Sequence, residues 1–130
     1  MTGTTKANRP LSPHLMIYRP QMTSVLSIFH RITGIGLMLS LLLIIVWFIA
    51  LSLGVEYFAR ISAFFDSIFV RILLAGSVWA LSYHTCTGVR HLIWDLGYGL
   101  NPKWINPSAL VVLFSSFLLT ASVLLLDWIV

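Results

Sequence analysis

The sequence predicts an all-α membrane protein with three transmembrane helices. Of its 130 residues, 58% are hydrophobic and only 9% are charged, which excludes an ordinary soluble domain. Three stretches, 32–55, 72–89 and 108–126, lack Asp, Glu, Lys and Arg. Crossing a bilayer takes about 20 residues. Backbone groups in lipid must be satisfied internally, and no stretch alternates like a barrel strand, so we expect all three to be helices.

We divide the chain into an inner-side N-terminal segment, residues 1–26, and a three-helix transmembrane domain, residues 27–130. The spans are expected at about 28–53, 68–93 and 108–128. Residues 9–21 hold three prolines and should be extended or turning. The first span should be retained and not cleaved as a signal peptide, because its polar flank is long and no small-residue cleavage pattern follows it.

The distribution of charge predicts the orientation. Six basic residues precede the first span or lie near the connection between spans two and three: Lys6, Arg9, Arg19, Arg31, Arg90 and Lys103. The connection between spans one and two has two basic residues and two acidic ones. The positive-inside rule then places the N-terminus in the cytoplasm of a bacterium, or in the matrix of a mitochondrion. The net charge of +4 therefore indicates membrane orientation and not nucleic-acid binding.

The single cysteine, Cys86, cannot form an intramolecular disulfide, and no C-x-x-C-H haem attachment motif is present. We expect Cys86 to be a small packing residue.

A histidine lies well inside the second span. His84 precedes Arg90, which is expected at the membrane edge, by six residues, hence ~9 Å along a helix. It shares a helical stripe with Gly76, Ala80 and Gly88, and such stripes usually mark close helix packing. An ionisable residue inside a span is a functional hypothesis by default. A flat macrocycle needs a ligand nitrogen and bare backbone beside it, so the stripe suggests a haem site or, alternatively, a buried hydrogen-bonded histidine.

A second axial ligand for such a haem is harder to find in this chain. His91 shares the face of His84 but lies ~10.5 Å away along the axis. His30 is expected at the inner edge of the first span, shallower than His84, and His14 precedes the spans. A histidine partner for His84 would therefore come from another chain.

A polar cluster is predicted where the first span begins. Ser27 and Arg31 are four residues apart, and His30 lies nearby on the face that also carries Gly34. Arg31 could hold a carboxylate such as a haem propionate, since its guanidinium fork suits carboxylates. The cluster could equally hydrogen-bond a quinone carbonyl. The alternative is an interfacial polar cap with a snorkelling arginine.

Three stretches, RPLSPHL at 9–15, SIFHRIT at 27–33 and HTCTGVRHLIWD at 84–95, carry a family resemblance. They closely resemble the motifs of the cytochrome b subunit of succinate dehydrogenase. The positions that fill those motifs are Arg9, Pro10, Leu11, Ser27, His30, Arg31, Thr33, His84, Gly88, Arg90, His91, Trp94 and Asp95.

The resemblance implies that the three helices form half of a heterodimeric membrane-anchor bundle. The implied partners are a second small anchor subunit, an iron–sulfur protein and a flavoprotein, and electrons from succinate reach ubiquinone. It implies one haem b shared with the partner anchor, with His84 as axial ligand of the haem iron. His30, Arg31 and His91 would lie near the propionates, and Ser27 and Arg31 near the quinone. No catalytic residue is implied within this chain. The alternative is a structural anchor of a related quinone oxidoreductase without a functional haem.

Overall fold

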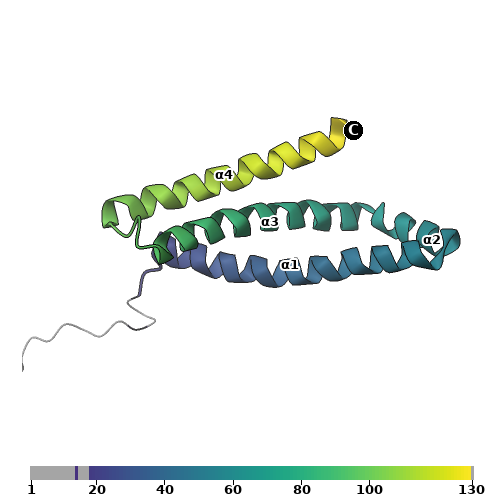
Figure 1. Ribbon diagram of the computed structural model, residues 1–130, viewed down its shortest axis with the longest axis horizontal. Helices are drawn as coiled ribbons and strands as arrows, with labels where there is room; N and C mark the ends of the chain where they lie inside the picture. The colour runs from purple at the N-terminus through teal and green to yellow at the C-terminus, as the bar shows by residue number, and fades with distance from the viewer. Residues whose placement is uncertain (1–13, 15–17, 130) are drawn as a thin grey trace, which may run out of the picture.

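The computed structural model describes His14 and residues 18–129, and for residues 127–129 only the backbone. It contains four helices: α1 (Met22–Leu53), α2 (Val55–Phe65), α3 (Ile68–Asp95) and α4 (Pro102–Ile129). Figure 1 shows α1 and α3 running side by side, with α2 at the far end and α4 along α3. Every regular element in the described part is helical, which confirms the predicted fold class.

Three of these helices are long and apolar enough to cross a membrane: Met22–Leu53, Ile68–Asp95 and Pro102–Leu126. α1 begins six residues before the span expected there, so residues 22–26, which were assigned to the N-terminal segment, are helical. α4 also begins six residues earlier than expected. The expected spans followed the apolar runs, whereas α1 and α4 both begin several residues before those runs. Most of the proline-rich segment 9–21 lies outside the described residues.

The turn between α3 and α4 is short because both helix ends are capped locally. Gly97 has φ +83°, and its N–H donates to the Trp94 carbonyl while that of Tyr98 donates to Ile93, which is a Schellman ending. Pro102 starts α4 after Asn101, whose side-chain oxygen accepts from the Lys103 N–H at 3.0 Å. The connection between spans two and three is therefore reduced to residues 96–101.

A small core joins the three long helices. Leu26, Tyr83, Ala109 and Val112 form one buried cluster, and the Tyr83 hydroxyl donates to the Leu26 carbonyl at 2.8 Å. Large apolar side chains elsewhere are mostly exposed, as expected of surfaces that face lipid. Burial in this chain is therefore concentrated at helix contacts.

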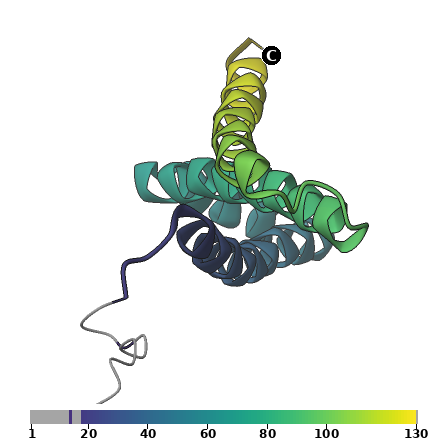
Figure 2. The same ribbon diagram turned by 90° about the vertical axis from the view of Figure 1, so that its left-hand side faces the viewer.

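We call the end of the bundle with the start of α1, the end of α3 and the start of α4 the inner end. α4 packs mainly on α3 and much less on α1. Figures 1 and 2 both show α4 diverging from the α1–α3 pair toward its C-terminus. The helices are thus joined most closely toward the inner end.

Candidate functional site: a histidine pair and a polar pocket

Two histidines meet face to face between α1 and α3. The ring centroids of His30 and His84 are 3.8 Å apart and their planes differ by 14°. The prediction that His30 lies at a shallower depth than His84 was wrong. Because their rings are stacked, both histidines lie at the same level of the antiparallel pair. His30 is eight residues from the start of α1, and His84 is eleven residues from the end of α3.

Each histidine is held by a threonine of the opposite helix. Nδ1 of His84 lies 3.3 Å from the Thr33 hydroxyl and 3.0 Å from the His30 carbonyl. Nδ1 of His30 contacts the Thr87 hydroxyl. Both threonines lie three residues after a histidine in their own helix, so two His-x-x-Thr segments bond reciprocally.

These hydrogen bonds define the tautomer of the neutral His84 ring. A backbone carbonyl can only accept, so Nδ1 of neutral His84 carries the proton. The hydrogen bonds that His84 makes within the described part of the chain all use Nδ1. Nε2 then has a free lone pair, which is the arrangement of a metal-ligating imidazole whose other nitrogen donates to the protein.

Two glycines allow the helices to approach at this point. A Cβ built on Gly34 would lie 3.1 Å from Cε1 of His84, and one on Gly88 would lie 3.9 Å from Cε1 of His30. Gly76, by contrast, has no atom within 4 Å of such a Cβ. The predicted small-residue stripe is therefore divided, since Gly88 packs against α1 whereas Gly76 borders open space.

A polar pocket of about 390 Å³ lies beside the histidine pair at the inner end. Its lining residues come from α1 and α3: Thr23, Ser24, Ser27, Ile28, Arg31, His91 and Trp94. Ser27 and His91 are partly buried, and Arg31 is exposed. His30 does not line the pocket, because its ring is stacked on His84 of α3. Its ring centroid lies 5.3 Å from that of His91, in an edge-on contact. The structure thus brings Ser27, Arg31 and His91 together.

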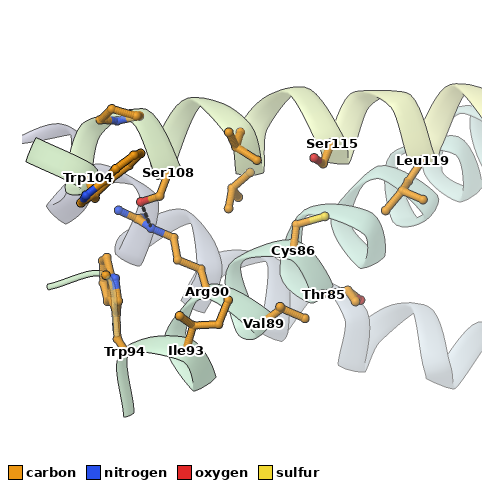
Figure 3. A pocket seen from close by; sticks show the side chains of 14 residues that line it. Thr85, Cys86, Val89, Arg90, Ile93, Trp94, Trp104, Ser108, Ser115 and Leu119 are labelled. Atoms are coloured by element: carbon orange, nitrogen blue, oxygen red, sulfur yellow. Dashed lines mark hydrogen bonds between the residues drawn. The ribbon is translucent and has the colours of Figure 1, made fainter. Parts of the chain in front are cut away.

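A second, more apolar cavity of about 630 Å³ lies between α3 and α4 (Figure 3). Arg90, only 6% exposed, lies at this cavity. Its Nε donates to the Ser108 hydroxyl at 3.0 Å and its Nη2 to the Ile105 carbonyl at 2.8 Å. Cys86 lines the same cavity.

Sequence reasoning assigned no role to Thr87, to Arg90 beyond its charge and motif position, or to Trp94 beyond its motif position at the membrane interface. The repeated His-x-x-Thr spacing was a usable signal for Thr87, because residues three apart share a helix face. No signal identified the partners of Arg90, which lie 15 and 18 residues away on α4. Within the described residues, no group of three or more His, Cys, Asp and Glu could hold a bare metal ion.

Three membrane-spanning helices with a histidine pair between two of them define a multi-pass helical membrane protein with a ligand-competent imidazole. Residues 5–123 match the family model described as "Succinate dehydrogenase/Fumarate reductase transmembrane subunit". The chain belongs to this family, which confirms the resemblance inferred from its motifs.

Curated relatives support the same assignment. The chain is 40% identical over 112 residues to the succinate dehydrogenase cytochrome b556 subunit of Rickettsia prowazekii, covering 86% of this chain and 87% of the relative. It is 40% identical to the cytochrome b560 subunit of Marchantia polymorpha over 95% of this chain and 94% of the relative. The b556 subunit of Paracoccus denitrificans is 38% identical, over 96% of each chain.

Proposed function

We propose that this chain is the cytochrome b subunit that anchors a succinate dehydrogenase in the inner membrane and helps to form its haem and ubiquinone sites. The observation that carries the proposal is His84, whose Nδ1 donates to α1 and leaves Nε2 available between membrane helices. Family membership and three spanning helices support the anchoring role.

His84 is proposed as one axial ligand of a single haem b, which supplies a one-electron centre when bound. The stacked His30 cannot be the opposite ligand of the same iron. Opposite ligands must point their lone pairs at one iron from two sides, whereas the rings of His30 and His84 lie side by side and nearly parallel, 3.8 Å apart. The second ligand, a histidine, is therefore assigned to the partner anchor subunit. His30, Arg31 and His91 are proposed to lie near the haem propionates, where the Arg31 guanidinium provides charge complementarity.

The polar pocket is proposed as this chain's part of the ubiquinone site. Ser27 can donate a hydrogen bond to a quinone carbonyl, and Arg31 provides a positive field for the negative charge that develops there during reduction. The remaining walls would come from the iron–sulfur protein and the second anchor subunit. A flavoprotein would complete the assembly.

The inner end is proposed to face the cytoplasm, or the mitochondrial matrix in an organelle, because the basic residues of the chain gather there. The iron–sulfur protein would then approach the polar pocket from that side.

A visible spectrum of the purified complex tests the haem assignment. His84→Leu should remove or strongly alter the reduced-minus-oxidised b-type spectrum, whereas His14→Ala, at a position before α1, should leave it intact. An unchanged spectrum in the His84 variant would refute the ligand assignment. A complex with no b-type spectrum in its native form would favour the structural anchor without a functional haem.

Quinone kinetics test the pocket assignment. A lost hydrogen bond to a charged group costs ~1.5–3 kcal/mol, so Ser27→Ala should slow succinate-to-quinone turnover roughly 10- to 150-fold. Succinate oxidation with a dye that takes electrons upstream should survive. Ser52→Ala, at the other end of α1, is the matched control and should change neither activity. Equal loss of both activities in Ser27→Ala would point to assembly and contradict the quinone role.

A further inference from the structure

One wall of the polar pocket is shared with the apolar cavity. Trp94 lines both, so its indole separates the space beside Ser27 and Arg31 from the space between α3 and α4. The residues that line the polar pocket come from α1 and α3. Any influence of α4 on that pocket must therefore pass through a residue such as Trp94.

Arg90 provides this connection. Its Cζ lies 4.1 Å from the centroid of the Trp94 ring, within the range of a cation–π contact. The same guanidinium donates to Ser108 and Ile105 on α4. Figure 3 shows Arg90 reaching toward α4, with the bond to Ser108 drawn and Trp94 beside it. A single side chain thus ties the first turns of α4 to the shared wall.

The geometry around Arg90 favours a fixed arrangement. Its neighbours on α4 are a hydroxyl and a carbonyl, both neutral, and the one ion pair among the described residues joins Arg71 and Asp66 elsewhere. A desolvated cation is strongly attracted to an aromatic face. The electron-rich face of Trp94 therefore adds to the two α4 acceptors in stabilising the buried guanidinium, and moving the indole away would remove that contact.

Trp94 is also restricted on its other sides. The His91 ring meets it edge-on at 5.5 Å, and a Cβ built on Gly99 would lie 3.6 Å from its ring atoms. Gly99 has φ +75°, a conformation that favours glycine, so the backbone after α3 passes close to the indole. His91 lines the polar pocket with Trp94, so the two rings in contact form one part of the pocket wall.

We propose that Arg90 is a positioning residue for the quinone pocket, holding the Trp94 wall in place from α4 without itself reaching the quinone. This inference rests on the proposed function, which assigns the polar pocket to ubiquinone. It predicts that losing the Arg90 guanidinium weakens quinone binding in the ground state and the transition state alike, and so raises KM more than it lowers kcat.

The test uses the whole purified complex, with activity normalised to succinate–dye reduction. Arg90→Gln should raise the KM for a short-chain quinone about tenfold and change kcat less than twofold. Arg90→Lys retains a cation over Trp94 but not the guanidinium fork, and its KM should lie between those of the native complex and Arg90→Gln. Arg71→Gln, an exposed arginine at the opposite end of α3, should leave both constants unchanged.

A double-mutant cycle separates positioning through Trp94 from a general structural effect. If Arg90 acts through the indole, Arg90→Gln should add nothing to the KM of Trp94→Ala, because the interacting partner is already absent. Trp94→Leu replaces Trp94→Ala in the cycle if the latter lowers the yield of complex. Fully additive effects, or an unchanged KM in Arg90→Gln, would overturn the proposal.

The failure of this inference can be told from failure of the proposed function. If Ser27→Ala has no effect on quinone kinetics, the polar pocket is not the quinone site, and both proposals fall. If Ser27→Ala slows turnover but Arg90→Gln does not raise KM, only the positioning role is wrong.

Discussion

The contact between Gly34 of α1 and His84 of α3 gives a sharp test of the site. A Cβ on Gly34 would lie 3.1 Å from Cε1 of His84, which is shorter than the optimal carbon–carbon separation of roughly 3.5–4.0 Å. Gly34→Ala should therefore push the His84 ring away from α1 by about 0.4 Å. The substitution adds one methyl group and leaves the ligand itself in place.

The consequence can be worked out from the bonds of the ring. His84 Nδ1 lies 3.0 Å from the His30 carbonyl and 3.3 Å from Thr33, and both partners are on α1. Outward displacement would lengthen them to about 3.4 and about 3.7 Å, at or beyond the limit of a useful hydrogen bond. Bonds between membrane helices are worth roughly 0.6–1.7 kcal/mol. The midpoint potential changes by the part of this energy that differs between the oxidised and reduced states, which for a one-electron couple is at most about 25–70 mV.

The sign of this shift follows from the chemistry of the ligand. A histidine that donates from its second nitrogen is a more basic ligand, which favours the oxidised iron. Weakening the Nδ1 bonds of His84 should therefore raise the midpoint potential of the b-type haem. A redox titration of the purified complex, followed in the visible spectrum, measures the change directly.

Gly36→Ala is the matched control. A Cβ at Gly36 meets no atom within 4 Å, yet this position lies two residues away on the same helix and gains the same helix propensity of about 1 kcal/mol. Its potential should equal that of the native protein. An unshifted potential in Gly34→Ala, or an equal shift in both variants, would refute the argument that His84 is held against α1.

Two further predictions concern stability and are measured by thermal unfolding of the assembled complex. Thr87→Val should lower the stability of the α1–α3 contact by about 1 kcal/mol, because Thr87 is 2% exposed and its hydroxyl contacts His30. Thr85→Val, on an exposed face, is the control and should have little effect. Equal losses of stability in the two variants would contradict the role of Thr87. Arg71→Gln should change stability by less than about 0.5 kcal/mol, since the Arg71–Asp66 side chains are 65% and 72% exposed, and a loss several times larger would show that this ion pair is not the surface contact described.

The sequence was sufficient to predict the number of spanning helices, because uncharged apolar runs report directly on the cost of burying charge in lipid. It also pointed to His84, since an ionisable residue inside a span is rare enough to stand out. The histidine stacking could not be predicted, because it depends on the register between α1 and α3, and no local pattern encodes the relative sliding of two antiparallel helices. The pocket around Ser27 was anticipated only in part, since Ser27 and Arg31 share a helix but Trp94 reaches them through tertiary packing.

The contacts of Arg90 could not be predicted from the sequence either. Its place at the end of an apolar run predicts a residue near the membrane edge, and no local pattern shows that its side chain is buried against α4. The helix ends only at the Schellman motif around Gly97. Helix ends that rely on glycine conformation are visible in the sequence only as candidates, because glycine also occurs in turns and packing contacts.

The dependence of Arg90 on α4 has a consequence for biosynthesis. The bonds that join α1 to α3 involve residues that have all been synthesised before α4 begins, so the histidine pair can form while the last helix is still being translated. Arg90 at that stage lacks both of its α4 acceptors, and an unpaired guanidinium inside the bilayer is unfavourable. A nascent chain that ends before residue 105 should therefore hold the end of α3 nearer the aqueous surface. Arrival of α4 would draw Arg90 inward, so that insertion of the last helix also completes the wall of a pocket to which it contributes no lining residue.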